Sequence, residues 1–272
     1  MAEETTLRIG LVGRGAIGRH VAGQIRQIPG AALVGLLVAR PDRETPEAMP
    51  APVTSLSDLL PGIDLLVDCA GHGALRAHAA TALAAGIDVL SVSPGAMADA
   101  DLERTLRDAA ESGAARLSFA SGAIGALDAL AAAREGGLDR VRYICRKPPA
   151  GWRGSLAEDA LDLDTLTEPA EHFSGSAREA ALRYPKNANV AGLVAMAGTG
   201  FDATQVGLIV DPTISTNRHE IEADGAFGRL SFVIEGRPLP GNPASSALAA
   251  LSVVAAIRRR LAWRDPARFH KG

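Results

Sequence analysis

The feature that most constrains how this chain folds is a glycine-rich motif near its start, Gly13-Arg14-Gly15-Ala16-Ile17-Gly18. The motif follows an apolar run over residues 7–12 and opens a helical stretch, which is where the first strand of a dinucleotide-binding unit turns into its first helix. There Gly13 permits the tight turn, Gly15 lets the backbone approach a pyrophosphate, and Gly18 allows close helix–strand packing. A turn without a ligand is the plain alternative. We predict a dinucleotide-binding loop made by Gly13, Gly15, Ala16, Ile17 and Gly18.

Strand and helix patterns alternate over the first part of the chain. We expect strands over residues 8–12, 33–39, 64–69, 88–93 and 116–120, with helices between them, for example over 75–85 and 101–112. Near-continuous apolar strands separated by helices are typical of a parallel sheet covered on both faces. The predicted fold class is α/β, with a Rossmann-type doubly wound parallel sheet.

The pattern changes near residue 121. Helices are expected over 126–134, 177–183 and 189–196, and strands over 141–146, 205–210, 218–223 and 229–235, the last two joined by a hairpin. Consecutive strands without helices between them predict a second, antiparallel α+β domain. We expect a dinucleotide-binding domain over 1–121, a substrate and catalytic domain over 122–244, and a C-terminal helix over 245–262 that packs back onto the first domain.

Charge and cysteine content argue against several classes of protein. The 272 residues include 28 basic and 31 acidic side chains, without a basic run. We therefore expect neither nucleic acid nor an anionic membrane as partner, but a small-molecule substrate. The acidic start lacks the apolar region of a signal peptide, and no apolar stretch is long enough to span a bilayer. Cys69 and Cys145 have no disulfide or zinc spacing, which fits a cytoplasmic protein and a site without metal.

The residues after the second expected strand bear on the choice of cofactor. An NAD-preferring site usually carries Asp or Glu about 20 residues beyond the glycines, where it binds the ribose 2′-hydroxyl. Here the region reads Leu37-Val38-Ala39-Arg40, without a carboxylate, and Arg40 stands where it would meet a 2′-phosphate. An exposed loop arginine would look the same in sequence. We predict that both NAD and NADP serve as cofactors.

Two of the six histidines stand where chemistry is expected. His72 follows directly after an apolar strand, at the carboxyl edge of a parallel sheet where ligands bind, so we expect it to line the nicotinamide pocket. His219 lies in a strand whose period of two places it with Ile221 and Ala223 on one face. A histidine there is either a satisfied core residue or an acid–base group, and the pattern leaves both open. His172 is expected in a polar loop.

Cationic and amide side chains gather in two further stretches. Tyr184-Pro185-Lys186-Asn187-Ala188-Asn189-Val190 places a lysine and two asparagines at the start of a helix, which suits an anionic ligand or a cofactor amide. Arg146-Lys147-Pro148-Pro149 adds positive charge at the end of a strand. Helix capping by Asn187 and a solvated loop at 146–149 are the plain alternatives.

Several of these motifs together resemble the L-aspartate dehydrogenase family, from Gly10 to about Leu251. The glycine motif is generic, but two blocks are specific to that family: Y-P-K-N-A-N-V over 184–190 and G-A-I-G-A-L-D-A-L over 122–130. The sequence departs from the family at Arg14, where members often carry another residue. A side chain at this position can point into solvent, so the departure does not affect the resemblance.

The resemblance implies an activity and a set of site residues. The family oxidises L-aspartate to iminosuccinate with NAD(P), reversibly; iminosuccinate hydrolyses to oxaloacetate and ammonia, or feeds NAD biosynthesis in many bacteria. The cofactor-contacting alanine and asparagine fall on Ala123 and Asn189, and the catalytic histidine falls on His219. A dicarboxylate needs cationic partners, so the expected substrate residues are Lys147, Lys186, Asn187 and His72. We also expect a homodimer or a higher homo-oligomer.

Two other classes of protein fit the same outline. A semialdehyde dehydrogenase would share the two-domain plan and use a cysteine nucleophile, for which Cys145 would need a nearby base and a low pKa. A dinucleotide-sensing regulator would keep the glycine loop. Such a regulator would have no reason to hold His219, Lys147 and Lys186 together.

Overall fold

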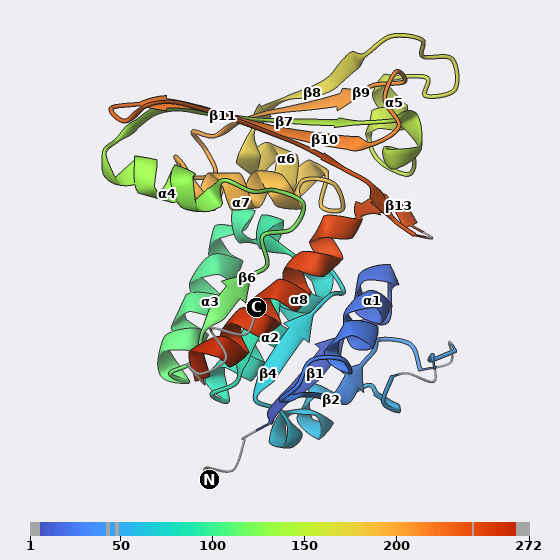
Figure 1. The fold of residues 1–272 in the computed structure, drawn as a ribbon, viewed down its shortest axis with the longest axis vertical. Coiled ribbons are helices and arrows are strands. Elements are labelled where there is room, and N and C mark those ends of the chain that lie inside the picture. Colours follow the sequence, from blue (N-terminus) through green and yellow to red (C-terminus); the bar gives the residue numbers. More distant parts are fainter. Residues whose placement is uncertain (1–5, 42–43, 47–48, 241, 265–272) are drawn as a thin grey trace. The chain divides into compact units, whose positions relative to one another are not determined.

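The computed structural model describes residues 6–41, 44–46, 49–240 and 242–264, which form two compact units (Figure 1). The first unit takes the described chain up to Ser93, Asp101–Ala120 and the described chain from Ala249 onward. The second unit takes Pro94–Ala100 and Ser121–Leu248. A short segment inside the expected 1–121 domain therefore belongs to the second unit.

This short segment carries the 3-10 helix η3 (Pro94–Ala98), which contacts α6 (Ala177–Arg183) and α7 (Asn189–Ala197). The contact depends on Gly192 in α7. A Cβ there would come within 2.8 Å of the Gly95 backbone nitrogen, so only glycine lets the two backbones approach this closely. Because the contact is non-local, no pattern within residues 94–100 indicates it.

A six-stranded sheet in the order β3-β2-β1-β4-β5-β6 forms the centre of the first unit, and all neighbouring strands are parallel. This is the order of a doubly wound Rossmann sheet, which confirms the predicted fold class. The strands are β1 (Leu7–Val12), β2 (Ala31–Leu37), β3 (Pro52–Val53), β4 (Leu65–Asp68), β5 (Asp88–Ser91) and β6 (Leu117–Phe119). The helices are α1 (Ala16–Ile25), α2 (His72–Ala84), α3 (Ala100–Ser112) and α8 (Ala247–Arg264), with 3-10 turns η1 (Leu56–Asp58) and η2 (Leu60–Gly62).

The C-terminal helix α8 forms part of the core of the first unit. Val253, Ile257 and Leu261 of α8 are buried together with Val21 and Ile25 of α1 and the apolar residues of β1. The two helices share one face of the parallel sheet (Figure 1). Neither α8 nor any other helix in the described part of the chain is long and apolar enough to cross a membrane.

The second unit is built on a five-stranded sheet in the order β11-β10-β7-β9-β8. Its strands are β7 (Leu138–Lys147), β8 (Ala170–Ser176), β9 (Gln205–Val210), β10 (Asn217–Gly225) and β11 (Gly228–Gly236). The expectation of a purely antiparallel domain is wrong at one pair, because β7 and β9 are parallel. The long connection between them, which contains β8 and three helices, permits this pairing. The remaining elements are α4 (Leu127–Glu135), η4 (Pro149–Gly151), α5 (Ala157–Ala160), β12 (Pro238–Leu239) and β13 (Asn242–Ser246).

The two faces of this five-stranded sheet differ. His219, Ile221 and the other alternate residues of β10 are buried while the residues between them are half-buried, as the period of two predicts. Val141 of β7 lies against the end of α7, where a Cβ on Gly198 would come within 3.2 Å of it. Helices α4, α6 and α7 lie on this side of the sheet (Figure 1).

We call the side that carries Tyr143, Lys147 and His219 the helix face. The side that carries Arg146 and Glu220 is the open face, because no described helix of the second unit lies over it (Figure 1). Successive side chains of a strand point to opposite faces, so Arg146 and Lys147 are neighbours in sequence on opposite sides of the sheet.

Candidate active site

The glycine-rich loop between β1 and α1 has the backbone that its motif predicts. Gly13 adopts φ +92°, which disfavours every other residue, and a Cβ there would lie 2.8 Å from the Ala70 Cβ. A Cβ on Gly18 would collide with the Gly13 carbonyl oxygen, so α1 packs on the loop at the closest possible range. Gly15, in contrast, has no atom within 4 Å of the place its Cβ would take. The loop is closely packed at Gly13 and Gly18, and it leaves room for a ligand beside Gly15.

The N-terminus of α1 suits a pyrophosphate. Gly15 is the N-cap, no side chain caps the helix, and the first turn, which begins with Ala16 and Ile17, has no acidic residue. The N–H groups of a first turn and the positive end of the helix dipole both favour an anion. The residues present therefore fit a dinucleotide, and the loop with this helix end would hold its pyrophosphate.

Arg14 ties the glycine-rich loop to the segment that follows β2. It donates to the Thr45 hydroxyl at 2.5 Å and to the backbone carbonyl of Arg40. Arg14 therefore does not extend freely into solvent, because its guanidinium finds acceptors in that segment. The Arg40 side chain is exposed, and no carboxylate lies between β2 and Arg40.

The other expected cofactor residues lie in different units. His72 is the first residue of α2 in the first unit and is half-buried. Ala123 is buried in the second unit. Asn189, the first residue of α7, accepts a hydrogen bond at Oδ1 from the Gly95 N–H at 3.3 Å. The roles of these three residues stay predictions.

Lys147 is a buried cation that forms no ion pair with any described residue. It ends β7 on the helix face and is only 4% exposed. Its Nζ donates to Asn187 Oδ1 at 2.8 Å and lies 5.0 Å from the centre of the Trp152 ring. Burial lowers the pKa of Lys147. An amide and an indole offset only part of the cost of burying an ammonium, so an anionic ligand would be stabilised here.

His219 lies on β10 directly beside Cys145 of β7 and is 3% exposed. Its Nδ1 is 2.7 Å from the hydroxyl of Tyr143, which is fully buried. Its Nε2 is shielded from solvent and has no hydrogen-bond partner among the described residues. Burial, and secondly the positive charge of Lys147, lower the pKa of His219 to about 3. The imidazole is therefore neutral with one nitrogen unpaired, which a satisfied core histidine would not be.

His172 is a residue of this region that the sequence did not indicate. It lies in β8, half-buried, and its ring meets the Trp152 ring edge-on with 4.5 Å between centroids. Its Nδ1 is 3.2 Å from the Tyr184 hydroxyl, and its buried Nε2 has no partner among the described residues. Burial and then the charge of Lys147 lower the pKa of His172 to about 4. The expectation of a polar loop is wrong because this polar segment pairs with β9 as an edge strand.

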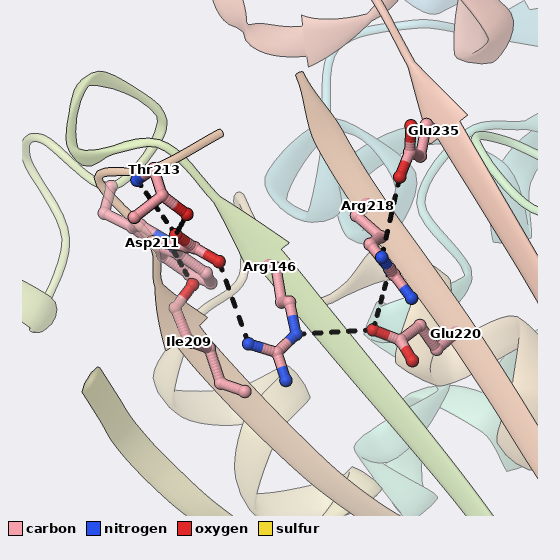
Figure 2. Close-up of polar contacts among 8 residues, drawn as sticks. Arg146, Ile209, Asp211, Thr213, Arg218, Glu220 and Glu235 are labelled. Carbon is pink, nitrogen blue, oxygen red and sulfur yellow. Dashed lines mark hydrogen bonds and ion pairs between the residues drawn. The ribbon is translucent and has the colours of Figure 1, made fainter. Parts of the chain in front are cut away.

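The open face is arranged differently (Figure 2). Arg146 lies between two carboxylates, 3.3 Å from Glu220 and 3.8 Å from Asp211, and Arg218 lies between Glu220 at 3.0 Å and Glu235 at 3.6 Å. Asp211 also accepts hydrogen bonds from the Thr213 N–H and hydroxyl. The cation of Arg146 is thus neutralised within the sheet, while that of Lys147 is not.

The adjacent residues Lys186 and Asn187 are placed differently. Asn187 contacts Lys147 through its side chain, and α7 has no side-chain cap, so capping does not explain this asparagine. Lys186 is exposed and forms no ion pair with any described residue. The structure therefore brings Asn187, but not Lys186, to the buried group around Lys147.

Neither cysteine has the surroundings of a nucleophile. Cys145 is fully buried, and burial raises the pKa of its thiol despite an opposing effect of Lys147. Burial also raises the pKa of Cys69, and the neighbouring Asp68 adds to the rise. A reactive cysteine needs a lowered pKa and some exposure, so both thiols are inert.

A doubly wound sheet with an open anion site at its first helix, joined to an α+β unit that holds a buried lysine and a neutral histidine, defines a nicotinamide-dependent dehydrogenase of two domains. Residues 13–120 match the family model of the NAD-binding domain of homoserine dehydrogenase, and residues 128–260 match the C-terminal domain of aspartate dehydrogenase.

Comparison with individual proteins identifies the family. The chain is 56% identical to the L-aspartate dehydrogenase of Ruegeria pomeroyi over 262 residues, covering 95% of this chain and 94% of that one. It is 46% identical to the L-aspartate dehydrogenase of Pseudomonas aeruginosa, covering 92% and 96%. Its fold resembles that of the aspartate dehydrogenase of Thermotoga maritima, with a TM-score of 0.73 and 24% identity over 93% and 96% of the two chains. The chain belongs to the L-aspartate dehydrogenase family and is an NAD-binding oxidoreductase.

Proposed function

We propose that this chain catalyses the reversible oxidation of L-aspartate to iminosuccinate, with NAD or NADP as the second substrate. The observation that carries the proposal is the pair on the helix face, an unneutralised buried ammonium at Lys147 and a neutral imidazole with an unpaired nitrogen at His219. The first suits a carboxylate and the second suits proton transfer. The names of the relatives support L-aspartate as the amino acid.

Lys147 would bind a carboxylate of the substrate while Asn187 holds its ammonium in place. Binding also changes His219. The positive charge of Lys147 is one cause of the low pKa of His219, and a bound carboxylate offsets that charge. Substrate binding would therefore raise the pKa of His219 toward the range in which a histidine serves as a base.

Oxidation breaks the Cα–H bond of the substrate and forms a C=N bond. When bound, the nicotinamide accepts the hydride. The Nε2 atom of His219 would accept the proton that the amino group loses, because Nδ1 is hydrogen-bonded to the Tyr143 hydroxyl. Iminosuccinate and water then give oxaloacetate and ammonia, and the same nitrogen would serve as the base for the attacking water. Iminosuccinate that is not hydrolysed would supply NAD biosynthesis, as the family resemblance implies.

The decisive experiment is a spectrophotometric screen of L-amino acids with NAD and with NADP, following the absorbance of the reduced cofactor. L-Aspartate should be oxidised fastest, and oxaloacetate with ammonium should drive the reverse reaction. Oxidation of another amino acid without oxidation of L-aspartate would overturn the proposal.

We infer that the glycine-rich loop binds the cofactor, together with Ala123 and Asn189, and that Arg40 binds the 2′-phosphate of NADP. The support is an exposed arginine at the end of β2 where no carboxylate stands. The substitution Arg40→Ala should raise the KM for NADP about tenfold, the effect of losing one charge-assisted contact, and leave the KM for NAD nearly unchanged. Equal changes for both cofactors would remove Arg40 from this role.

The competing classes have less support. A semialdehyde dehydrogenase needs a thiolate, and Cys145 is a buried thiol with a raised pKa. A thiol-blocking reagent should leave activity intact. A dinucleotide sensor would have no use for Lys147 and His219 on one face of the sheet. Lys186 is exposed and does not join this group.

Two expectations about the environment of the protein stay proposals. Both cysteines are free thiols, which supports the reducing cytoplasm. A homodimer or larger homo-oligomer is expected, and light scattering on the purified chain would measure it.

A further inference from the structure

The reaction proposed above does not involve His172, yet the pairing of β8 with β9 is irregular at this residue. In the pairing of β8 with β9, Glu171 faces Ile209 and Phe173 faces Leu208, so His172 is the extra residue of a β-bulge. A bulge turns a side chain away from the regular alternation and is common next to active sites. His172 and Phe173 consequently both contact Tyr184, with ring centroids 5.3 and 5.4 Å from it.

The bulge places His172 and Lys147 against the same indole. The Trp152 ring has the His172 ring at 4.5 Å and the Lys147 ammonium at 5.0 Å from its centroid. Trp152 is fully buried and fixed by its Nε1–H, which donates to the Ile209 carbonyl at 3.0 Å. The Trp152 indole is thus held in place, and both the Lys147 ammonium and the His172 imidazole pack against it.

The imidazole of His172 repeats the arrangement of His219. In both residues a tyrosine hydroxyl contacts Nδ1 and Nε2 is buried without a partner in the described chain. Either atom of each pair can be the donor, so the tautomer differs with the role: His219 accepts a proton at Nε2 when its Nδ1–H donates to Tyr143, and His172 donates from Nε2 when the Tyr184 hydroxyl donates to its Nδ1. A neutral imidazole that accepts at Nδ1 carries its own proton on Nε2 and is a donor there. An unpaired buried donor is destabilising, and a phenylalanine would fill the same space without that cost.

The order of the strands separates the two histidines. His219 lies on β10, on one side of β7, whereas His172 lies on β8, beyond β9 on the other side. Lys147 stands between them on β7. An amino acid whose amino group lies at His219 would have to extend its side chain across β7 to reach Lys147 and then His172.

We propose that His172 binds the side-chain carboxylate of the substrate together with Lys147, with Nε2–H as the donor, and so determines the preference for a dicarboxylic amino acid. This inference rests on the proposed function and adds a residue to it. The carboxylate receives one charge-assisted contact from the ammonium and one hydrogen bond from the imidazole.

The test compares His172→Phe and His172→Gln with wild type. His172→Phe keeps the ring against Trp152 and removes the donor, so the KM for L-aspartate should rise about tenfold with kcat changed less than about threefold. His172→Gln, whose amide can place an N–H near the former Nε2, should restore much of the affinity. His78→Phe, which changes a half-buried histidine of α2, is the matched control and should leave KM unchanged.

A second readout does not depend on turnover. Binding of succinate, a dicarboxylate, should weaken about tenfold in His172→Phe. In a Lys147→Met background the effect of His172→Phe should shrink, because both residues hold one carboxylate.

The outcomes separate the two proposals. A wild-type enzyme that ignores L-aspartate defeats the proposed function, and the succinate titration then still decides whether Lys147 and His172 form one anion site. A wild-type enzyme that oxidises L-aspartate, with unchanged KM and succinate affinity in His172→Phe, overturns the role of His172 alone. If His172→Phe unfolds at a lower temperature than wild type, Tyr184→Phe decides: a raised KM for L-aspartate supports the inference, and an unchanged KM overturns it.

Discussion

The helix face and the open face of the five-stranded sheet both carry cationic side chains, but only the open face pairs them with carboxylates. On the open face Arg146 and Arg218 alternate with carboxylates, so the charges neutralise one another (Figure 2). One residue farther along the same strand, on the helix face, Lys147 meets only an amide and an indole. Burial, and secondly the charge of Lys147, lower the pKa values of His172 and His219 and keep both histidines neutral.

The difference shows which cation is available to a ligand. Arg146 and Lys147 are indistinguishable as positive charges at the end of a strand, but only Lys147 lacks a carboxylate among the described residues. The charges of the open face are neutralised as folded, whereas a bound anion would neutralise Lys147 on the helix face. Unpaired buried charge therefore indicates a ligand where charge density alone does not.

The largest expected effect is the loss of His219 from the helix face. His219→Ala should lower kcat by roughly 10²–10⁴, the contribution of a positioned acid–base group, while the affinity for cofactor stays near wild type. His219→Asn keeps polarity but loses the titrating nitrogen and should be about as poor. Steady-state kcat at saturating L-aspartate, with a fluorescence titration of the cofactor, measures both quantities.

The pH dependence provides the control for His219. The wild-type oxidation rate should fall as the pH is lowered through the pKa that His219 has in the substrate complex, because the protonated ring no longer accepts a proton. This limb should be absent from both variants. Near-normal kcat with an intact acid limb in His219→Ala would transfer the role to His72.

The next effect comes from exchanging the two adjacent cations in turn. Lys147→Met should lower kcat/KM for L-aspartate roughly ten- to hundredfold, because a charge-assisted contact to the substrate is lost. Arg146→Met, on the open face, should change it less than about threefold, and so should Lys186→Met at its exposed position. Similar losses in Lys147→Met and Arg146→Met would break the comparison between the faces.

The same pair should have opposite effects on stability. Lys147→Met removes a buried charge without an acidic partner and should raise the unfolding temperature of the ligand-free protein. Arg146→Met leaves Asp211 without its cation and Glu220 with Arg218 alone, and should lower the unfolding temperature slightly. Thermal unfolding without substrate measures both changes. A lower unfolding temperature in Lys147→Met would contradict the view that the buried charge of Lys147 is not offset by its neighbours.

What could be predicted from sequence was local. The glycine-rich loop depends on backbone room within six residues, and the alternation of β10 depends on a period of two, so both are visible in the chain itself. His172 was missed because its edge strand is polar and its bulge breaks any period. The contact of Tyr143 with His219 joins residues 76 apart, and the parallel pairing of β7 with β9 spans a still longer connection. No short pattern encodes such contacts, and they are what distinguishes a reactive histidine from a core one.

The smallest expected effect is on stability in mild acid, and it separates the faces once more. His219 and His172 have folded-state pKa values of about 3 and about 4, below the value of about 6.5 in an unfolded chain. Between about pH 6.5 and 4 the unfolded chain binds protons at these positions and the folded chain does not, so the free energy of unfolding falls as the pH drops through that window.

His219→Asn or His172→Gln each removes one such site and should flatten the fall. Arg146→Met should keep the wild-type slope, because the described open face holds no histidine. Urea unfolding followed by tryptophan fluorescence, for which buried Trp152 is a reporter, measures the slope at several pH values. Equal slopes in all four proteins would mean that the helix-face histidines titrate as they do in the unfolded chain, and the contrast between the two faces would then not extend to protonation.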